Sequence, residues 1–251
     1  STSYEAFFFF FFGMQVAIDE LLKNQDMEYK KFQEKLIPSV EADKIIGVRT
    51  SSLRLIAKRI FNENKYVEFF SELPHKYFEE NQIHGFLFSW IKDYDFLITE
   101  LVKFFPYIDN WATCDQISPC IFQKNKEKIF PKIVEWCSSG DDEEYKVRFS
   151  IRMMMNYFLD SEFSEDKLYI ISDIKSEKYY VQMMIAWFFA TALAKQYSSA
   201  LKIIKDQELE PWTHNKAIQK ALESFRVSDE HKNELRNLKI QGEFKKFSFK
   251  I

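Results

Sequence analysis

Residues 74–106, PHKYFEENQIHGFLFSWIKDYDFLITELVKFFP, hold two amphipathic segments enclosed by two prolines. Apolar side chains recur in them at the three- and four-residue spacing of one helix face, which predicts helices over residues 75–92 and 94–105. Proline interrupts a helix because it lacks the backbone N–H and its ring clashes with the preceding turn. Such interruptions recur about every 30 to 40 residues, the length of a helical-hairpin repeat, at Pro38, Pro74 and Pro106. The stretch therefore predicts a stack of antiparallel helix pairs.

The same pattern extends along the rest of the chain, with a clear loop at Ser-Ser-Gly-Asp, residues 138–141. The further helices that it predicts cover residues 14–24, 26–36, 49–62, 64–72, 107–118, 123–137, 143–160, 163–172, 176–196, 198–206, 213–224 and 228–239. Only five glycines and six prolines are present, too few for the tight turns of an all-β or βαβ architecture. We therefore predict an all-α fold, a degenerate α-solenoid with a concave surface.

The first thirteen residues differ from the rest, because residues 7–12 are six consecutive phenylalanines followed by Gly13 and Met14. We interpret residues 1–13 as a tag or another non-native segment and expect a single domain over residues 14–251. The phenylalanine run is too short for a transmembrane helix and has no basic flank or cleavage site typical of a signal peptide.

Charge, cysteine and histidine usage exclude several classes of function. The formal net charge of −3 argues against a uniformly basic nucleic-acid binder but allows a local basic patch. Three cysteines without CxxC spacing indicate reduced thiols in a cytoplasmic protein, and four histidines without ligand spacing indicate no metal site. Glycine-rich phosphate loops and GxSxG motifs are also absent from the sequence, so we expect neither a nucleotide hydrolase nor a common covalent hydrolase. We therefore predict no metal and no cofactor.

Residues 107–115, YIDNWATCD, place an indole and a carboxylate four residues apart in a predicted helix. At this spacing Trp111 and Asp115 lie on one face, one turn apart. An electron-rich ring beside a carboxylate can stabilise a developing positive charge, as in the cleavage of a bond to a cationic sugar. The alternative is a core tryptophan and a structural aspartate. Asp109 points to a different face if both are helical, and we interpret it as a cap or a packing partner.

Several segments, taken in order, resemble one known family. They are Gly47-Val48-Arg49, Glu79-Glu80-Asn81 with His84-Gly85, the segment 107–115, Tyr145-Lys146-Val147-Arg148-Phe149, Tyr179-Tyr180-Val181 with Ala186-Trp187, and Trp212-Thr213-His214-Asn215-Lys216. Between about residue 27 and residue 239 the chain is similar to the AlkD-like DNA alkylation repair proteins, which are built from HEAT-like helical repeats.

The resemblance implies an alkylpurine DNA glycosylase that hydrolyses the N-glycosidic bond of cationic N3- or N7-alkylated purines in double-stranded DNA. Asp115 then corresponds to the catalytic carboxylate, while Trp111 and Trp187 correspond to the aromatic walls around the deoxyribose of the lesion. Arg148 corresponds to an arginine that holds backbone phosphate. The family also implies that the lesion is engaged without entering a deep base pocket.

Further basic residues are candidates for backbone phosphate contacts, since residues 211–251 hold nine Lys and Arg against five Asp and Glu. The candidates are Lys216, Lys220 and Arg226 near one end of the chain and Arg49 and Arg54 near the other. For each of them the alternative is a solvated surface charge. Active relatives carry an aromatic residue on an N-terminal helix against the lesion, and Tyr29 and Phe32 are the candidates, although their spacing to Gly47 is longer than expected.

Two other functions stay open. Sister groups that lack part of the N-terminal lesion-recognition element do not excise bases, so a non-catalytic DNA-binding member of the family is one alternative. A protein-binding scaffold is the other, because α-solenoids commonly serve that role and a fold does not determine a function. A DNA-binding protein of this type is expected to act as a monomer.

Overall fold

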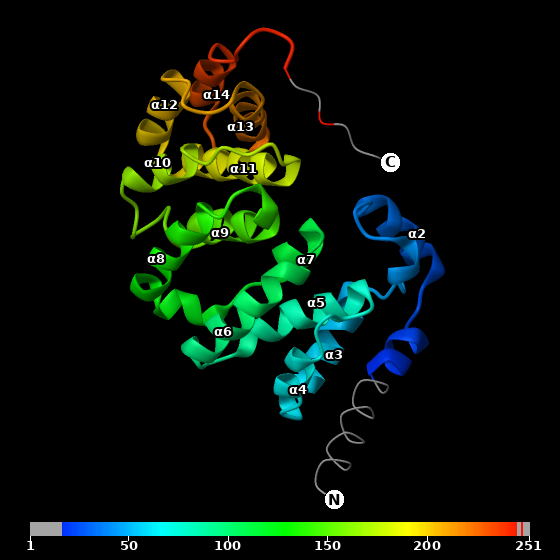
Figure 1. The fold of residues 1–251 in the computed structure, drawn as a ribbon. Helices are drawn as coiled ribbons and strands as arrows, with labels where there is room; N and C mark the ends of the chain where they lie inside the picture. The colour runs from blue at the N-terminus through cyan, green and yellow to red at the C-terminus, as the bar shows by residue number, and fades with distance from the viewer. Residues whose placement is uncertain (1–16, 245–246, 248–251) are drawn as a thin grey trace, which may run out of the picture. The chain divides into compact units, whose positions relative to one another are not determined.

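The computed structural model describes residues 17–244 and 247, and every regular element in this part of the chain is a helix. The predicted tag segment, residues 1–13, lies outside the described residues. The chain divides into two compact units, unit 1 up to Lys124 and unit 2 from Asn125 onward (Figure 1). Each unit has its own helical layers and its own apolar core.

The described part of unit 1 contains a helical segment over residues 17–23, four α-helices of ten or more residues and several shorter helices. They are α2 (Met27–Leu36), η1 (Ala42–Lys44), α3 (Thr50–Asn62), α4 (Tyr66–Ser71), α5 (Phe78–Leu87), η2 (Phe88–Trp90), α6 (Tyr94–Phe104), η3 (Phe105–Tyr107), α7 (Trp111–Gln116) and η4 (Cys120–Lys124). One layer forms because α5 packs between α3 and α7. The second layer forms where Tyr66 and Phe70 of α4 meet Phe96 of α6, with ring centroids 6.3 and 6.2 Å apart.

Unit 2 repeats this two-layer arrangement more regularly (Figure 1). Its elements are α8 (Lys126–Cys137), η5 (Asp141–Glu143), α9 (Glu144–Tyr157), α10 (Asp166–Ser172), α11 (Tyr179–Lys195), α12 (Tyr197–Lys205), α13 (Pro211–Glu223) and α14 (Asp229–Arg236). In one layer α11 packs between α9 and α13, and in the other α10 packs between α8 and α12. The predicted all-α solenoid fold is therefore confirmed.

Local chemistry accounts for where the helices differ from their predicted limits. The helix predicted over residues 107–118 is only the six-residue α7, because Asn110 is extended and its side-chain oxygen accepts the N–H of Thr113, so the helix begins after it. The helix predicted over residues 75–92 is α5 followed by the 3₁₀ turn η2. The loop predicted at residues 138–141 is confirmed over residues 138–140, with Gly140 at φ +83°, and Asp141 begins η5.

One buried hydrogen bond occurs twice, 100 residues apart, and joins equivalent helices in the two units. Gln82 Nε2 on α5 donates to Thr113 Oγ1 on α7 over 3.1 Å, and Thr213 Oγ1 on α13 donates to Gln182 Oε1 on α11 over 3.3 Å. All four side chains are buried. A buried polar group is costly unless it is paired, so each bond fixes the register between two successive helices of its layer.

The core of unit 1 contains a histidine pair among aromatic rings. His75 Nε2 and His84 Nδ1 lie 2.8 Å apart, and the ring of His84 stacks on Phe104 with centroids 3.9 Å apart. Burial lowers the pKa of His75 to about 4 and lowers the pKa of His84 well below its usual value, with His75 adding to the effect. Both imidazoles are therefore neutral at physiological pH, and their nitrogens bond to each other inside the aromatic cluster.

We expect the His75 imidazole to titrate with a midpoint near pH 4, because its surroundings disfavour the charged ring. The unfolded chain binds this proton near pH 6.5. His75 therefore lowers the free energy of unfolding as the pH falls from about 6.5 to about 4. Burial raises the pKa of Glu72 to about 7, which acts in the opposite sense, so an NMR titration isolates His75 better than a stability curve. Signals assigned with a His75→Gln variant that titrate near pH 6.5 would contradict this description.

Candidate nucleic-acid interface

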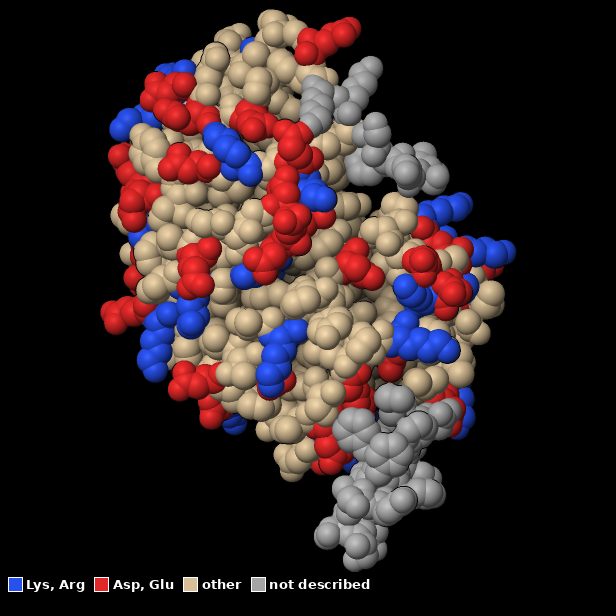
Figure 2. Space-filling model, viewed as in Figure 1, with Lys and Arg blue, Asp and Glu red and all other residues tan. Residues whose placement is uncertain are grey.

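Acidic and basic side chains are intermixed on the face of the molecule that Figure 2 shows, and no continuous basic surface covers it. This agrees with the net charge of −3. A partner with many phosphates is bound by local groups of Lys and Arg when the total charge is not positive. The candidate residues are therefore distinguished by their neighbours and by their exposure.

The predicted tryptophan and carboxylate lie together on α7. Trp111 is the first residue of this helix and Asp115 the fifth, so the two side chains are one turn apart, as predicted. Both residues are partly buried. The indole packs against a cluster of buried side chains, Ile37, Val40, Ile45 and Phe78. Trp111 is thus part of the core on one side and accessible on the other.

A hydrogen bond fixes the indole of Trp111. Its Nε1 donates to the backbone oxygen of Leu36, the last residue of α2, over 3.3 Å. The bond joins α7 to the end of a helix 75 residues earlier in the sequence. Since a ring held at its nitrogen and packed against a core cannot swing freely, Trp111 presents a defined surface beside Asp115.

The interpretation of Asp109 as a cap is wrong. Asn110 caps α7, and Asp109 lies on the surface before the helix, where its Oδ1 accepts a hydrogen bond from Asn110 Nδ2 over 2.8 Å. The reason is local, because only the extended backbone of Asn110 brings a side-chain oxygen to the N–H of Thr113. Asp109 is an exposed carboxylate six residues from Asp115.

The two aromatic candidates of the N-terminal region lie on α2, in the same unit as Trp111. Phe32 is 55% exposed, and its ring centroid lies 6.0 Å from that of Tyr29. The hydroxyl of Tyr29 accepts a hydrogen bond from Gln33 Nε2 over 2.6 Å and lies 3.4 Å from Thr50 Oγ1. Tyr29 is thus anchored at its hydroxyl, whereas Phe32 is available for a contact with a partner.

Arg49 and Arg54 of unit 1 both have exposed guanidinium groups with protein partners. Arg49 donates from Nε and Nη2 to Asp26 Oδ2, over 3.1 and 2.8 Å. The backbone N–H of Tyr29 and then Arg49 lower the pKa of the Asp26 carboxyl. Arg54 lies 4.4 Å from the ring centroid of Phe86 and donates to Gln116 Oε1 over 3.3 Å. Arg54 is therefore a cation that contacts α7, the helix that carries Asp115.

Unit 2 presents its own group of aromatic and basic side chains. Trp187 is 44% exposed, although most of the apolar residues of α11 are buried. Lys220 Nζ on α13 lies 5.8 Å from the centroid of the Trp187 ring. Burial lowers the pKa of Lys220, Glu223 raises it, and the neighbouring cations Lys216 and Arg148 lower it further. Such an accumulation of positive charge favours an anionic partner.

Arg148 is held inside unit 2, and only 4% of it is exposed. Its Nη1 donates to the backbone oxygen of Tyr180 over 2.8 Å, and its guanidinium lies 5.9 Å from the Tyr180 ring centroid. This hydrogen bond joins α9 to the second residue of α11. No role was predicted for Tyr180 from the sequence. The two consecutive tyrosines at the start of α11, Tyr179 and Tyr180, were the feature of the sequence that could have drawn attention to it.

The remaining candidates lie on α13 and beyond its end. Lys216 Nζ lies 5.6 Å from the ring centroid of Trp212 and donates to Gln219 Oε1 over 2.8 Å. Lys216 and Lys220 share one helix face at four-residue spacing. Arg226 is exposed in the turn that follows, where its backbone N–H donates to Ser224 Oγ over 3.2 Å.

A cavity, a possible metal site and a possible membrane span were compared with the positions of the candidate residues. A cavity of about 250 Å³ in unit 2 is lined by residues of the α8–α9 and α10–α11 connections, such as Cys137, Asp141 and Ser176, and not by Trp187 or Lys220. Within residues 17–244, no three His, Cys, Asp or Glu side chains are grouped to hold a metal ion. The same part of the chain contains no helix with the length and apolar character needed to cross a bilayer.

Comparison with known proteins gives one family. Residues 17–221 match the model of the family described as DNA alkylation repair enzyme, which confirms the resemblance that the sequence motifs predicted. The matched range includes Asp115, Trp187 and Lys220 and ends before Arg226. No match was found among the curated proteins. Because the match spans most of the 251 residues, the chain belongs to the DNA alkylation repair enzyme family.

Proposed function

We propose that this member of the DNA alkylation repair family is an alkylpurine DNA glycosylase. Membership of the family places the protein in DNA alkylation repair. The observation that carries the more specific proposal is the pairing of a fixed indole, Trp111, with the Asp115 carboxylate one turn away on α7. A scaffold protein has no need of that pair at the positions that the family resemblance assigns to the chemistry.

The reaction needs little from the protein beyond stabilisation of a cation. A purine alkylated at N3 or N7 already carries positive charge, so the bond from the sugar C1′ to the base breaks with both electrons leaving on the base. The sugar then becomes oxocarbenium-like. The Asp115 carboxylate stabilises this charge and orients a water molecule whose oxygen bonds to C1′. The proton released from that water passes to the carboxylate or to solvent.

Trp111 is proposed to contact the sugar through its ring face, not through its indole N–H. The indole N–H is used by the backbone oxygen of Leu36, and one side of the residue packs on the Ile37 cluster. The accessible part of the ring can face a cationic sugar, which the negative face of an aromatic ring attracts. On the family resemblance we assign the same role to Trp187 in unit 2, whose ring is 44% exposed.

Binding of the DNA backbone is assigned to the cations that solvent can reach, of which Arg226 is exposed and Lys216 and Lys220 are partly buried. In unit 2, Lys216, Lys220 and Arg226 offer charges that phosphates can neutralise. Arg148 is too deeply buried to be the main contact, and we assign it the role of supporting the Lys220 group through charge and through its bond to Tyr180. In unit 1 we assign a phosphate contact to Arg54, which donates to Gln116 on the helix that carries Asp115.

Replacement of Asp115 by Asn should lower the single-turnover rate of alkylpurine excision by roughly 100-fold, because the amide is isosteric but carries no charge to stabilise the cation. The measurement is the release of 7-methylguanine and 3-methyladenine from methylated duplex DNA. Asp109→Asn is the matched control, since it removes a carboxylate from the surface just before the same helix, and it should excise like the wild type. Folding and DNA affinity of Asp115→Asn should be retained.

Excision at the wild-type rate by Asp115→Asn would refute the assignment of this carboxylate. If the wild-type protein binds methylated duplex DNA but releases no base, the protein is a non-catalytic DNA-binding member of its family. Absence of both binding and excision would favour the protein-binding scaffold.

Replacement of Lys220 by Ala should weaken binding to duplex DNA and reduce the slope of log affinity against log salt by about 0.9, the amount expected for one lost phosphate contact. Lys202→Ala is the control, because it removes a lysine of the same unit from α12, which lies in the other helical layer. There Lys202 pairs with Glu165. Fluorescence anisotropy at several salt concentrations measures both slopes. Equal slopes for Lys220→Ala and the wild type would show that Lys220 is a solvated surface charge.

A further inference from the structure

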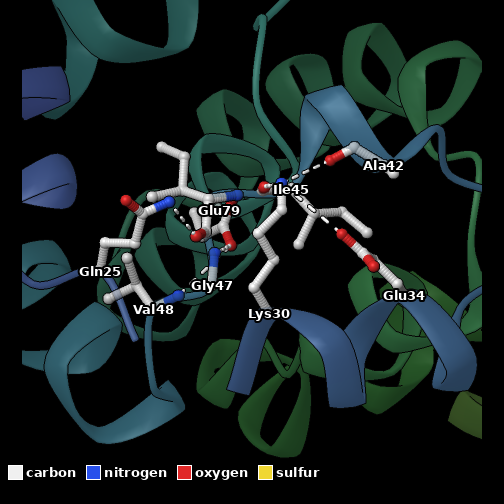
Figure 3. A network of polar contacts seen from close by, with 9 residues as sticks. Gln25, Lys30, Glu34, Ala42, Ile45, Gly47, Val48 and Glu79 are labelled. Atoms are coloured by element: carbon white, nitrogen blue, oxygen red, sulfur yellow. Dashed lines mark hydrogen bonds and ion pairs between the residues drawn. The ribbon is translucent and has the colours of Figure 1, made fainter. Parts of the chain in front are cut away.

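A carboxylate outside the proposed site is buried without any basic partner in its hydrogen bonds. Glu79, in the first turn of α5, is fully buried. Its Oε2 accepts the backbone N–H of Ile46 over 3.0 Å, and its Oε1 accepts those of Gly47 and Val48 over 2.7 and 3.4 Å (Figure 3). Consecutive N–H groups that converge on one carboxylate offset much of the cost of burying its charge. Glu79 therefore holds the turn at residues 46–48.

That turn fits directly against α2. Gly47 has φ +91°, and a Cβ at this position would lie 2.5 Å from Cβ of Lys30 and 2.7 Å from the backbone oxygen of Asp26. The oxygen of Gly47 accepts the N–H of Asp26, the residue that caps α2, over 2.8 Å. Only glycine allows both this backbone conformation and this approach. The turn that Glu79 holds is therefore the surface on which the first part of α2 lies.

Lys30 fastens the same helix to the chain that leads into the turn. Its Nζ donates to the backbone oxygens of Ala42 and Ile45 and lies 3.6 Å from Glu34 (Figure 3). The segment between α2 and α3, residues 37–49, is thus tied to α2 by Lys30 and to α5 by Glu79. Both ties use backbone groups of the segment, so they fix its path and not only its side chains.

The segment held in this way is also what Trp111 packs against. Ile37, Val40 and Ile45 of the segment form the cluster under the indole, together with Phe78, the residue before Glu79. The acceptor of the indole N–H, Leu36, is the residue just before the segment. A shift of the turn at residues 46–48 would therefore reach Trp111 through both its packing surface and its hydrogen bond.

We propose that Glu79 is a positioning residue that sets the orientation of Trp111 through the segment at residues 37–49. The structural role of Glu79 does not depend on the proposed function, and only the catalytic use of the Trp111 orientation rests on it. Glu79 is buried and contacts backbone, so it does not touch the DNA. Its effect on excision is an effect on Trp111, which keeps its place beside Asp115 only while the segment keeps its path.

The test compares Glu79→Gln with Glu80→Gln in the full chain labelled with 5-fluorotryptophan. Glu80 is the matched control, because it is the adjacent buried glutamate but accepts N–H groups only from Lys76 and Tyr77 at the start of its own helix. The fluorine resonance of Trp111, assigned by its loss in Trp111→Phe, should shift or broaden in Glu79→Gln. It should stay in place in Glu80→Gln, and the resonance of Trp136 in unit 2 should not move in either variant.

The activity of the same variants separates this inference from the proposed glycosylase function. An unchanged Trp111 resonance in Glu79→Gln, or an equal change in both variants, would overturn the positioning role. A Trp111 shift in Glu79→Gln together with a wild-type protein that excises no base would leave that role intact and refute the glycosylase. If Glu79→Gln does not fold, Gly47→Ala disturbs the same turn from its other side and should shift the same resonance.

Discussion

The contact on which unit 1 depends most is the one between the Glu79 carboxylate and three consecutive backbone amides. The chain between α2 and α3 has only one short 3₁₀ turn, yet Ile45, Ile46 and Val48 are buried. Buried backbone N–H groups outside a helix need acceptors from elsewhere, and each one left unpaired costs on the order of 1–3 kcal/mol. Glu79 supplies these acceptors from a helix more than 30 residues away. An irregular segment is thereby given one path, and α2 and α7 are placed against it.

The two units contribute different chemistry to the proposed function. In unit 1 a carboxylate and a fixed aromatic ring lie one turn apart on a short helix, which suits stabilisation of a cation. In unit 2 the exposed ring of Trp187 lies under Lys220, whose pKa is lowered first by burial and then by the nearby charges of Lys216 and Arg148. We therefore assign different roles to the two cations. Arg148 bonds to a backbone carbonyl inside the protein, whereas Lys220 is accessible to a phosphate.

Periodicity was sufficient to predict the helical layers but not the local geometry of the site. The spacing of apolar residues indicated nearly every helix, because a buried face recurs at a fixed interval. The start of α7 could not be found in this way, since it is set by one side-chain hydrogen bond, in which Asn110 accepts the N–H of Thr113. The same bond decides that Asn110 and not Asp109 is the cap. The prediction that Trp111 and Asp115 lie one helical turn apart is confirmed, because both residues lie inside the shortened helix.

Long-range contacts left no pattern that a sequence could reveal. Glu79 and Gly47 appear among the segments that resemble the family, but nothing in their spacing shows that one carboxylate binds the backbone of the other segment. The burial of Arg148 could not be predicted from spacing either, since Arg148 donates to a backbone oxygen 32 residues away. The repeated Gln–Thr bond is the exception. Gln82 with Thr113 and Gln182 with Thr213 share the same separation of 31 residues and mark a repeat that apolar periodicity alone does not show.

The proposed reaction breaks the bond between a cationic purine and its sugar. The most direct measurement uses a duplex that carries a single 7-methylguanine, incubated with an excess of the protein. The released small molecules and the abasic sites in the DNA are then quantified from the same sample. We predict free 7-methylguanine and abasic sites in equal amounts. A duplex that is bound by the protein but keeps its methylated base, or one whose guanine is restored in place, would contradict the account.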